Sequence, residues 1–313
     1  MSAALTRVLL TVIAFLAIIT LVFMLLRLAP GGPFDGERRL PPDIEANLRA
    51  AYHLNEPLPQ QYLRYLSALA RGDLGPSFRQ KDFTVNELVA RGLPVSLALG
   101  SGALVVALLL GLPLGLVAGM QPGTRLDRGL MGVAGLGIAL PAIILGPVAV
   151  LVFAVKLDWL PAAGSDSAAH FVLPIVTLAL PWVTAIARVL RTSTAETLSL
   201  PHIRTAYGKG LPTRRIVLSH VLPLALVPVI AFLGPATAGL LTGSVVVEQV
   251  FELPGIGRYF VQAALNRDYT LVMGVTIVYA SLLLICNLLA DLIVLWLDPR
   301  ARARVKTRVT TPT

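Results

Sequence analysis

One basic segment, RTAYGKGLPTRRIVLSHVLP, lies between two apolar stretches and has the residue types best suited to bind another molecule. It runs from Arg204 to Pro223 and combines cationic side chains with Ala206, Gly208 and Gly210. Arginine and lysine bind anionic groups, and small residues let another surface approach the backbone closely. The cations alone would suit a helix lying on anionic lipid. The small residues favour a groove on a partner protein, with lipid as an additional contact.

Patterns for catalysis and for cofactor binding are not apparent in the sequence. The fragment YGKGLP lacks the glycines that precede the lysine of a phosphate-binding G-x-x-x-x-G-K-[ST] loop, so we expect this chain to bind no nucleotide. The histidines are dispersed along the chain and do not suggest a metal site. A Ser-His-Asp set is not recognisable either. We therefore expect a protein with no catalytic residues, no metal ligands and no cofactor of its own.

Two acidic residues lie in or beside apolar stretches, where an isolated charge is unfavourable. Asp291 interrupts the last apolar stretch, and a carboxylate inside a membrane costs on the order of 2.5–3.5 kcal/mol on insertion scales. It should face the helix bundle or a cation, and Arg188 and Arg191 are candidate partners at similar depth. Glu248 follows the run GSVVV and is expected in the loop after it. Each acid is either a charge of a transport pathway or gate, or a structural group: an ion pair or a snorkelling end charge for Asp291, and a surface charge for Glu248.

The composition places these residues in a membrane protein. The chain has 313 residues, of which 56% are hydrophobic and 14% charged, and its mean hydropathy is +0.77. Soluble domains carry about 25% charged residues. The net charge of +9 reflects basic residues that flank apolar runs, which indicates membrane topology rather than nucleic-acid binding. Cys286, the single cysteine, excludes a disulfide framework within the chain.

Six stretches are long enough for the roughly 20 apolar residues that a transmembrane helix needs. The sequence therefore predicts an all-α membrane protein with six transmembrane helices. The spans are expected at or within residues 8–28, 92–124, 129–155, 171–189, 216–247 and 271–297. Gly111, Gly115 and Gly119 recur at every fourth position of the second span, which is typical of a helix-packing face.

The positions of lysine and arginine predict the orientation of the spans. These residues are concentrated in the loop after the second span, in the segment after the fourth span and in the tail, and Arg7 lies in the N-terminus. Six crossings place all four on one side, which is predicted to be cytoplasmic together with both termini. The first loop on the other side holds equal numbers of acidic and basic residues and can be translocated.

That first outer loop is longer than an ordinary connection, and two of its parts have helical spacing. They are PPDIEANLRAAYHL and QQYLRYLSALARGDLG. In the second part an apolar face is formed by Tyr62, Leu63, Tyr65, Leu66 and Leu69. We expect two short amphipathic helices on the outer surface, which either cap the bundle or dock an outer partner.

The basic segment lies in a loop at about residues 193–218. Its sequence predicts a short helix that starts at a Ser or Thr, a turn at Pro201 and a second short helix that stops at Gly210. Helices of this length are not stable alone in water, so they must pack on another surface.

The order and spacing of these motifs resemble the binding-protein-dependent ABC importer permeases of the peptide and nickel branch. In that family a cytoplasmic loop carries a Glu-Ala-Ala triplet, a glycine four residues later and I-x-L-P after nine more. Here Arg204, Thr205 and Ala206 occupy the triplet, as RTA…KGL does in this branch, Gly210 is the glycine, and HVLP ends at Pro223. The motifs RLAPGGPF, YHLNEPLPQQY, GDLGPSF, GSVVVEQVFELPGIGRYFVQAALNRDY and LDPR follow in the family's order. GERRLPPDIEANLRAAYHLNEP is most similar to the B-type permease of oligopeptide importers.

The resemblance implies the type I ABC importer permease fold and a subunit that forms half of a translocation pathway for oligopeptides. In the family, a second homologous permease, two cytoplasmic ATPase subunits that bind ATP and magnesium, and a periplasmic or lipid-anchored peptide-binding protein complete the importer. The family's coupling helix corresponds to Arg204–Gly210, while Leu222 and Pro223 would fix the start of the fifth span. Dipeptides, nickel chelates or another small solute are alternative cargoes.

The resemblance also implies a multi-pass protein of the bacterial inner membrane with three parts. These are the N-terminus and first span (1–30), a periplasmic helical loop (31–92) and a permease core (93–313) that includes the coupling loop and a basic tail (298–313). Two other classes of protein fit less well. A secondary transporter would need an ion-coupling site, for which Asp291 is the single candidate, and a membrane enzyme would need a catalytic set.

Overall fold

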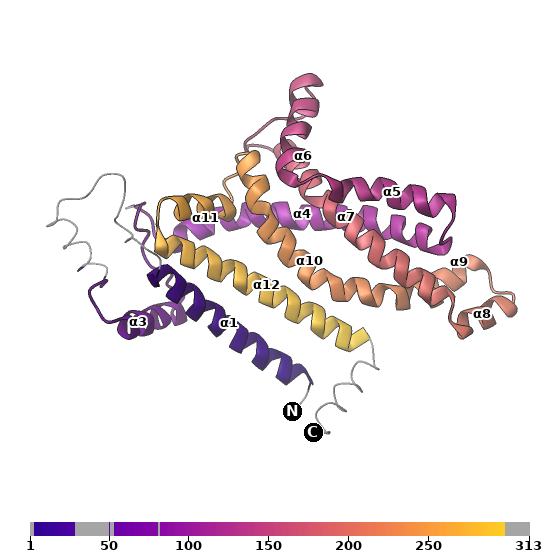
Figure 1. Ribbon diagram of the computed structural model, residues 1–313, viewed down its shortest axis with the longest axis horizontal. Helices are drawn as coiled ribbons and strands as arrows, with labels where there is room; N and C mark the ends of the chain where they lie inside the picture. The colour runs from indigo at the N-terminus through magenta and orange to yellow at the C-terminus, as the bar shows by residue number, and fades with distance from the viewer. Residues whose placement is uncertain (1–2, 29–49, 51–52, 81, 298–313) are drawn as a thin grey trace.

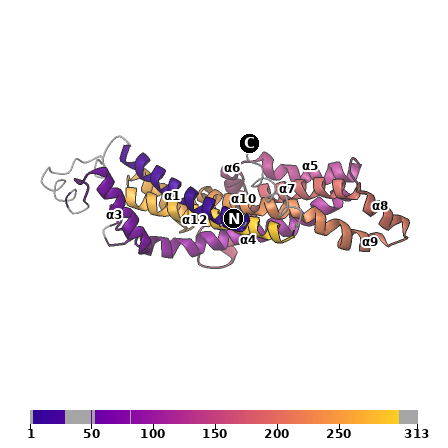
Figure 2. The same cartoon turned by 90° about the horizontal axis from the view of Figure 1, so that it is seen from below.

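A computed structural model describes residues 3–28, 50, 53–80 and 82–297, and within these residues the regular structure is helical (Figure 1). The long helices lie side by side, as the predicted all-α architecture requires. Helices α8 (Pro201–Gly208) and α9 (Thr213–Ile216) lie at one end of the bundle, while α3 (Leu58–Ala70) and α11 (Ile256–Leu265) lie at the other (Figures 1 and 2). We call these the α8 end and the α11 end.

Five helical stretches of the described chain are long and apolar enough to cross a membrane. They are α1 (Ala3–Leu28), α4 (Val85–Met120), α7 (Ala169–Leu198), the run from α9 through η2 (Val217–Val221) to α10 (Leu222–Val250), and α12 (Tyr269–Leu297). A sixth consists of α5 (Arg125–Ala139) followed by α6 (Ala142–Ala149) and the π-helix η1 (Val150–Lys156). The six predicted stretches are therefore all helical.

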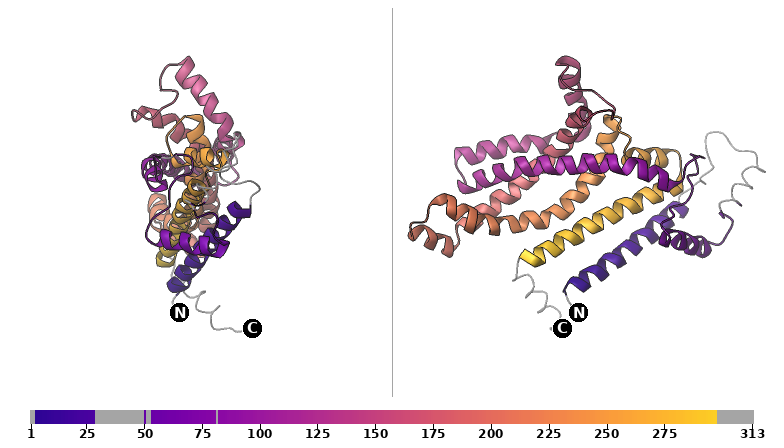
Figure 3. Two further views of the ribbon diagram at one scale, coloured as in Figure 1. Left: turned by 90° about the vertical axis from the view of Figure 1, so that its left-hand side faces the viewer. Right: turned by 180° about the vertical axis from the view of Figure 1, so that it is seen from behind.

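The third predicted span is bent by 96° where Pro141 interrupts it. Leu140 has the extended conformation (φ −108°, ψ 119°) that a residue before proline favours, so the helix stops before Pro141 and restarts after it. As a result, α6 and η1 project away from the bundle (Figures 1 and 3). Many of their apolar side chains are exposed, including Ile143, Ile144, Val148, Leu151 and Val155.

Helix α4 begins at Val85, before the apolar stretch from which we predicted it. Thr84 and Glu87 form a capping box: the Glu87 N–H donates to Thr84 Oγ1 (3.2 Å) and the Thr84 N–H donates to Glu87 Oε2 (2.9 Å). These bonds satisfy backbone donors that the first helical turn leaves without partners. The continuous helix therefore runs through residue 92, where we expected the outer loop to end.

The glycine stripe of α4 packs against α7, which confirms the predicted packing face. A Cβ atom at Gly115 would lie 2.5 Å from the carbonyl oxygen of Ala187, and one at Gly119 would lie 2.6 Å from that of Arg191. Gly111 similarly faces the carbonyl oxygen of Val183 at 3.0 Å. Side chains at these positions would push the two helices apart.

Helix α3 covers the parts of α1 and α12 near the α11 end with most of its predicted apolar face. Tyr62, Tyr65, Leu66 and Leu69 pack around Ile19, Phe23, Met273 and Ile277. Leu63 does not belong to this face: it is 64% exposed because it lies beside the stripe formed by the other four residues. The other predicted amphipathic helix and the basic tail lie largely outside the described residues.

The motif GDLGPSF is fastened to the start of α12 by Asp268, which is almost fully buried. Its carboxyl group accepts hydrogen bonds from the Ser77 hydroxyl and from the N–H groups of Phe78 (3.2 Å) and Leu271 (3.1 Å). One side chain therefore caps α12 and holds the segment that leads into α4.

We predict that Gly115→Ala lowers stability by about 1–3 kcal/mol, because the added methyl group overpacks the α4–α7 contact. Gly132→Ala in α5 is the control, since its Cβ would meet open space and alanine is the better helix former. Thermal unfolding of both variants in detergent measures the difference. Equal unfolding temperatures would contradict the glycine contact.

Candidate functional site

Helix α8 has a sharply defined start and end. Proline occupies its first turn, where no backbone N–H is needed for the helix. After the helix, the Gly210 N–H donates to the Tyr207 carbonyl (2.9 Å) and the Leu211 N–H donates to the Ala206 carbonyl (3.3 Å). This Schellman pattern needs a left-handed residue, and Gly210 supplies it with φ +76°. The predicted stop at Gly210 is confirmed.

The short helix predicted before Pro201 is wrong, because α7 continues without interruption to Leu198. Ser193 and Thr194 are buried within α7 and do not start a new helix. The Thr197 hydroxyl donates to the Ser193 carbonyl (2.7 Å), which is a bond within the helix rather than a cap. The connection from α7 to α8 is therefore a tight turn.

Helix α8 has one face buried in the bundle and one exposed. Ile203 and Ala206 are buried in a cluster with Leu190 of α7 and Ile216 of α9. The exposed residues, which we call the α8 outer face, are His202, Arg204, Thr205, Tyr207 and Lys209. The predicted triplet is thus divided: Arg204 and Thr205 face outward, whereas Ala206 anchors α8 from inside. Ala206 therefore does not contribute a small side chain to the exposed face of α8.

The α8 end is strongly cationic. Besides the α8 outer face, it exposes Arg125 and Arg128 of α5 and Arg214 and Arg215 of α9. Within the described residues, no ion pair to a carboxylate is formed by any of these four side chains or by Arg204 or Lys209. These cations are available to an acidic partner surface.

The run that contains the fifth span begins nine residues before Leu222, the first residue of the pair expected to fix its start. Helix α9, the π-helix η2 and α10 form one run that begins at Thr213. Pro223 has no N–H to donate to the carbonyl of Ser219 four residues earlier, and the chain adopts the wider π turn there. The pair therefore lies just inside the span and marks the end of this irregular turn.

A partly buried ion pair fixes the part of α7 that leads to α8. The Arg191 guanidinium donates to both carboxylate oxygens of Asp127 in α5, with distances of 3.1 and 2.6 Å. Asp127 is 3% exposed and also accepts the Gly123 N–H (2.8 Å). Our sequence reasoning missed this pair. Thr124, which caps α5 by accepting the Asp127 N–H, is a signal that could have placed this carboxylate at a helix start.

Asp291 pairs with Arg7 of α1, not with Arg188 or Arg191 as predicted. The Asp291 side chain is 52% exposed and that of Arg7 is 29% exposed, so the pair does not lie in the bundle interior. Similar depth in the membrane was an insufficient criterion, because the rotation of each helix decides which side chains meet. This contact joins the first turns of α1 to the last turns of α12.

Glu248 lies inside α10 and is fully buried, so the predicted position in an outer loop is wrong. Its Oε1 atom accepts hydrogen bonds from the hydroxyl groups of Ser96 (2.7 Å) and Ser244 (2.8 Å). Its Oε2 atom accepts the Arg258 N–H (3.2 Å). A buried carboxyl group with several donors is stabilised where it lies.

This cluster sets the position of α11. The Ser96 hydroxyl also accepts the Ile256 N–H (3.0 Å), so it links α4, α10 and the first turn of α11. Gly255 and Gly257 lie so close to the Glu248 carboxyl group that a Cβ atom at either would collide with it. The positive end of the α11 dipole points toward this carboxyl group. The arrangement holds α11 in place and resembles a structural anchor more than an exposed pathway charge.

A group of three or more His, Cys, Asp or Glu side chains able to hold a metal ion is absent from the described part of the chain.

Comparison with known proteins relates the whole chain to transport proteins. Residues 111–303 match the family described as "Binding-protein-dependent transport system inner membrane component". The oligopeptide transport system permease protein OppB of Salmonella typhimurium is 46% identical over 287 residues, which cover 91% of this chain and 94% of that protein. The dipeptide transport system permease protein DppB of Bacillus subtilis is 43% identical, with 93% of this chain and 94% of that protein covered.

The fold is also found in solved structures. An inward-facing structure of the MetNI methionine ABC transporter superposes with a TM-score of 0.56 at 22% identity. The match covers 67% of this chain and 96% of that one. At this level of identity the likeness concerns the fold, which is the type I ABC importer permease fold that the motifs implied.

We predict that Glu248→Gln loosens α11, because an amide cannot accept all the hydrogen bonds that the carboxyl group accepts. A buried donor without its partner costs about 1–3 kcal/mol. Amide hydrogen exchange in residues 256–265 should become faster. Glu252→Gln, an exposed acid in the turn before α11, is the matched control and should leave exchange unchanged. Identical exchange in the two variants would rule out the anchor.

Proposed function

Because the chain belongs to the family of binding-protein-dependent transport system inner membrane components, we propose that it is a permease subunit that imports oligopeptides with energy from ATP. The assignment of cargo is supported by the 46% identity to OppB along nearly the whole chain. DppB is almost as similar, so dipeptides are the second candidate. The chain is a multi-pass protein of the inner membrane.

The observation that carries this proposal is the geometry of α8. Ile203 and Ala206 fix it to the bundle, while Arg204, Thr205 and Tyr207 face outward. Two membrane spans, α7 and the α9–α10 run, begin or end directly beside it. A partner that moves α8 would therefore move both spans.

The partner is an ATPase subunit whose groove receives the α8 outer face. Arg204 and Thr205 make the contact, and Gly210 gives the helix the end that the groove requires. Ala206 contributes from inside by supporting the helix, and Leu222 and Pro223 contribute by setting the π turn that follows. Acidic residues in the groove would complement Arg204 and Lys209 of the α8 outer face.

The complete importer contains a second homologous permease, two ATPase subunits that bind ATP and magnesium, and an outer peptide-binding protein. This chain supplies half of the pathway and performs no hydrolysis itself. Exposed apolar residues along α6 and η1 suit contact with lipid and with the second permease. Nucleic acid is not a partner.

The α8 end faces the cytoplasm, and the α11 end faces the periplasm. The exposed cations of the α8 end support this orientation, because loops rich in lysine and arginine remain inside. The start of α1 and the end of α12 lie at the ends of these helices turned away from α3 and α11 (Figure 1), which supports cytoplasmic termini. Glu248 then anchors α11 on the outer side, and Asp291 ties α12 to α1 on the inner side.

Reconstitution of the chain with its partner subunits in proteoliposomes tests the cargo. Peptides of increasing length should be taken up in the presence of ATP and the binding protein, with oligopeptides preferred to dipeptides. The chain alone should neither hydrolyse ATP nor take up peptide when an ion gradient is applied. Ion-driven uptake by the chain alone would overturn the proposal.

We predict that Gly210→Val uncouples ATP hydrolysis from uptake, whereas Gly210→Asn largely preserves coupling. Valine in the left-handed conformation is strained by about 1–3 kcal/mol, and asparagine tolerates it. The ratio of peptide taken up to ATP hydrolysed is the measurement. If Asn uncouples as strongly as Val, close approach to the ATPase matters rather than conformation. Normal coupling in both variants would exclude this end of α8 from the contact.

We predict that Arg204→Glu weakens association with the ATPase subunits by about tenfold at low salt, because it replaces an attraction with a repulsion. The difference should shrink as salt is added. Arg125→Glu is the control: it changes the net charge equally at the same end but lies on α5. Co-purification at several salt concentrations measures both. Equal loss in the two variants would indicate a general charge effect and not an α8 contact.

A further inference from the structure

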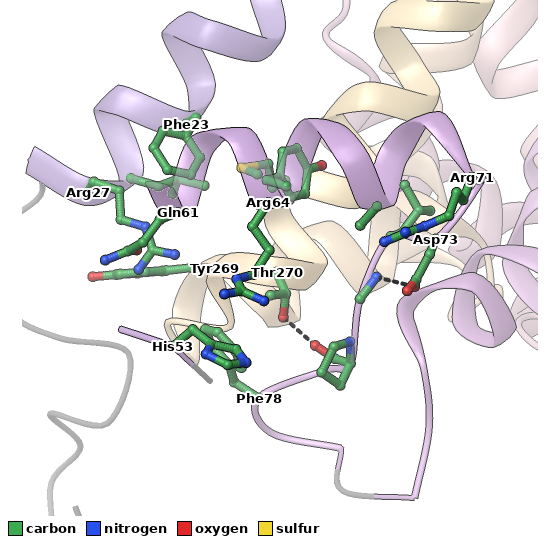
Figure 4. Close-up of a pocket in the computed structure, with 17 residues that line it drawn as sticks. Phe23, Arg27, His53, Gln61, Arg64, Arg71, Asp73, Phe78, Tyr269 and Thr270 are labelled. Atoms are coloured by element: carbon green, nitrogen blue, oxygen red, sulfur yellow. Dashed lines mark hydrogen bonds between the residues drawn. The ribbon is translucent and has the colours of Figure 1, made fainter. Parts of the chain in front are cut away.

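A cavity of about 360 Å³ lies at the α11 end, outside the Glu248 cluster and far from α8 (Figure 4). It is enclosed by α1, α3, the start of α12 and the segment 73–78. The interaction that joins α3 to α1 includes a hydrogen bond between the hydroxyl groups of Thr20 and Tyr62 (2.6 Å). The cavity is therefore built by packed elements of the fold.

The apolar part of the cavity lies between α1 and α12, where Phe23, Leu26 and Met273 line it. The exposed residues Leu21 and Leu25 lie on the opposite face of α1, two positions from Phe23. Because α1 is an apolar span, that exposed face lies against lipid chains on the far side of the helix from the cavity. The cavity opens near the end of α1, which is where lipid headgroups are expected.

The polar part of the cavity is cationic. Arg27, Arg64 and Arg71 line it, and Asp73 is the acidic residue among the described lining residues. Arg64 is paired with Glu56 at 2.6 Å, so its charge is already compensated. The Arg27 guanidinium lies over the Phe23 ring, 5.4 Å from its centre, and pairs with no carboxylate of the described residues. Arg27 can therefore hold an anionic group such as a phosphate.

Two further side chains in the cavity have polar atoms without partners. Gln61 is 8% exposed, and its Nε2 atom donates to the carbonyls of Leu54 (3.1 Å) and Glu56 (2.8 Å). Its Oε1 atom is thereby oriented but is buried without a hydrogen bond, as is the Tyr65 hydroxyl. Buried polar atoms normally have hydrogen-bond partners. An acceptor and a hydroxyl group without partners therefore indicate a place where a ligand can bind.

The two polar atoms without partners require different groups of a ligand. The Gln61 Oε1 atom needs a donor, and Figure 4 shows Gln61 beside Arg27. Burial raises the pKa of the Tyr65 hydroxyl, which therefore stays protonated and can donate to an anion. A fitting ligand carries an anionic oxygen for Arg27 and Tyr65 and a hydroxyl group for Gln61.

We propose that this cavity binds the headgroup of an anionic glycerol phospholipid of the outer leaflet, with phosphate at Arg27 and a glycerol hydroxyl at Gln61. Soluble glycerol phosphate has the same polar groups. The apolar lining distinguishes the lipid, because Leu26, which is partly exposed, can contact the first part of an acyl chain. This proposal does not depend on the cargo or on the coupling contact.

The test uses the full chain, purified in detergent together with the subunits that accompany it. Phosphatidylglycerol and phosphatidylethanolamine are added at equal concentration, and the retained lipid is measured by native mass spectrometry. We expect preferential retention of phosphatidylglycerol. Arg27→Gln should reduce that retention about tenfold, as expected for the loss of a hydrogen bond to a charged group. Arg267→Gln, which removes an exposed cation at the same end, should change it little.

Two more variants separate binding from folding. Arg27→Lys keeps the charge and should retain part of the preference, and Gln61→Met should weaken retention of phosphatidylglycerol alone. Unfolding temperatures without added lipid should be similar for Arg27→Gln and Arg267→Gln. Equal retention of the two lipids, or equal loss in these two variants, would overturn the proposal. Displacement of bound lipid by millimolar glycerol phosphate, or by a peptide, would also overturn it.

Discussion

The backbone contact between α4 and α7 is the constraint on which the other parts of the structure depend. Lipid is as apolar as a leucine side chain, so helices in a membrane associate through close packing rather than through the hydrophobic effect. Gly111, Gly115 and Gly119 permit that packing by removing side chains that face the α7 carbonyls. Helix α7 then carries α8, and α4 carries Ser96 to the Glu248 cluster. Both ends of the bundle are thus positioned by one contact.

Polar side chains reinforce this arrangement at the ends of the helices. Asp127 joins α5 to α7, Asp268 joins the segment before α4 to α12, and Glu248 joins α10 to α4 and α11. In each case one carboxyl group accepts several donors from different elements, so the cost of burying it is offset locally. Removal of one partner would leave a buried group unsatisfied, which makes these contacts specific as well as stabilising.

Sequence reasoning succeeded where the signal is local and failed where it is not. The spans, the glycine stripe and the stop at Gly210 follow from apolar length, small-residue spacing and helix-end chemistry. Glu248 was misplaced because its burial depends on Ser96, which is remote in sequence. Asp291 was assigned the wrong partner because depth in the membrane does not specify the rotation of α1 and α12. A proline inside a span indicates a bend, but the continuous apolar run around Pro141 does not show how far the helix turns there.

The irregular turn η2 affects how a displacement of α8 would be transmitted to α7 and α10. A π turn after a mobile segment is often interpreted as a hinge. Here Val217 and Val221 of η2 are buried, and Ile216 and Val221 share one cluster with Leu190 of α7 and Ile203 of α8. Bending at η2 would break this packing, whereas movement of α7, α8 and the start of α10 together would preserve it. Under the proposed function, a movement that the ATPase imposes on α8 would therefore be transmitted to the α11 end by α7 and α10 moving together.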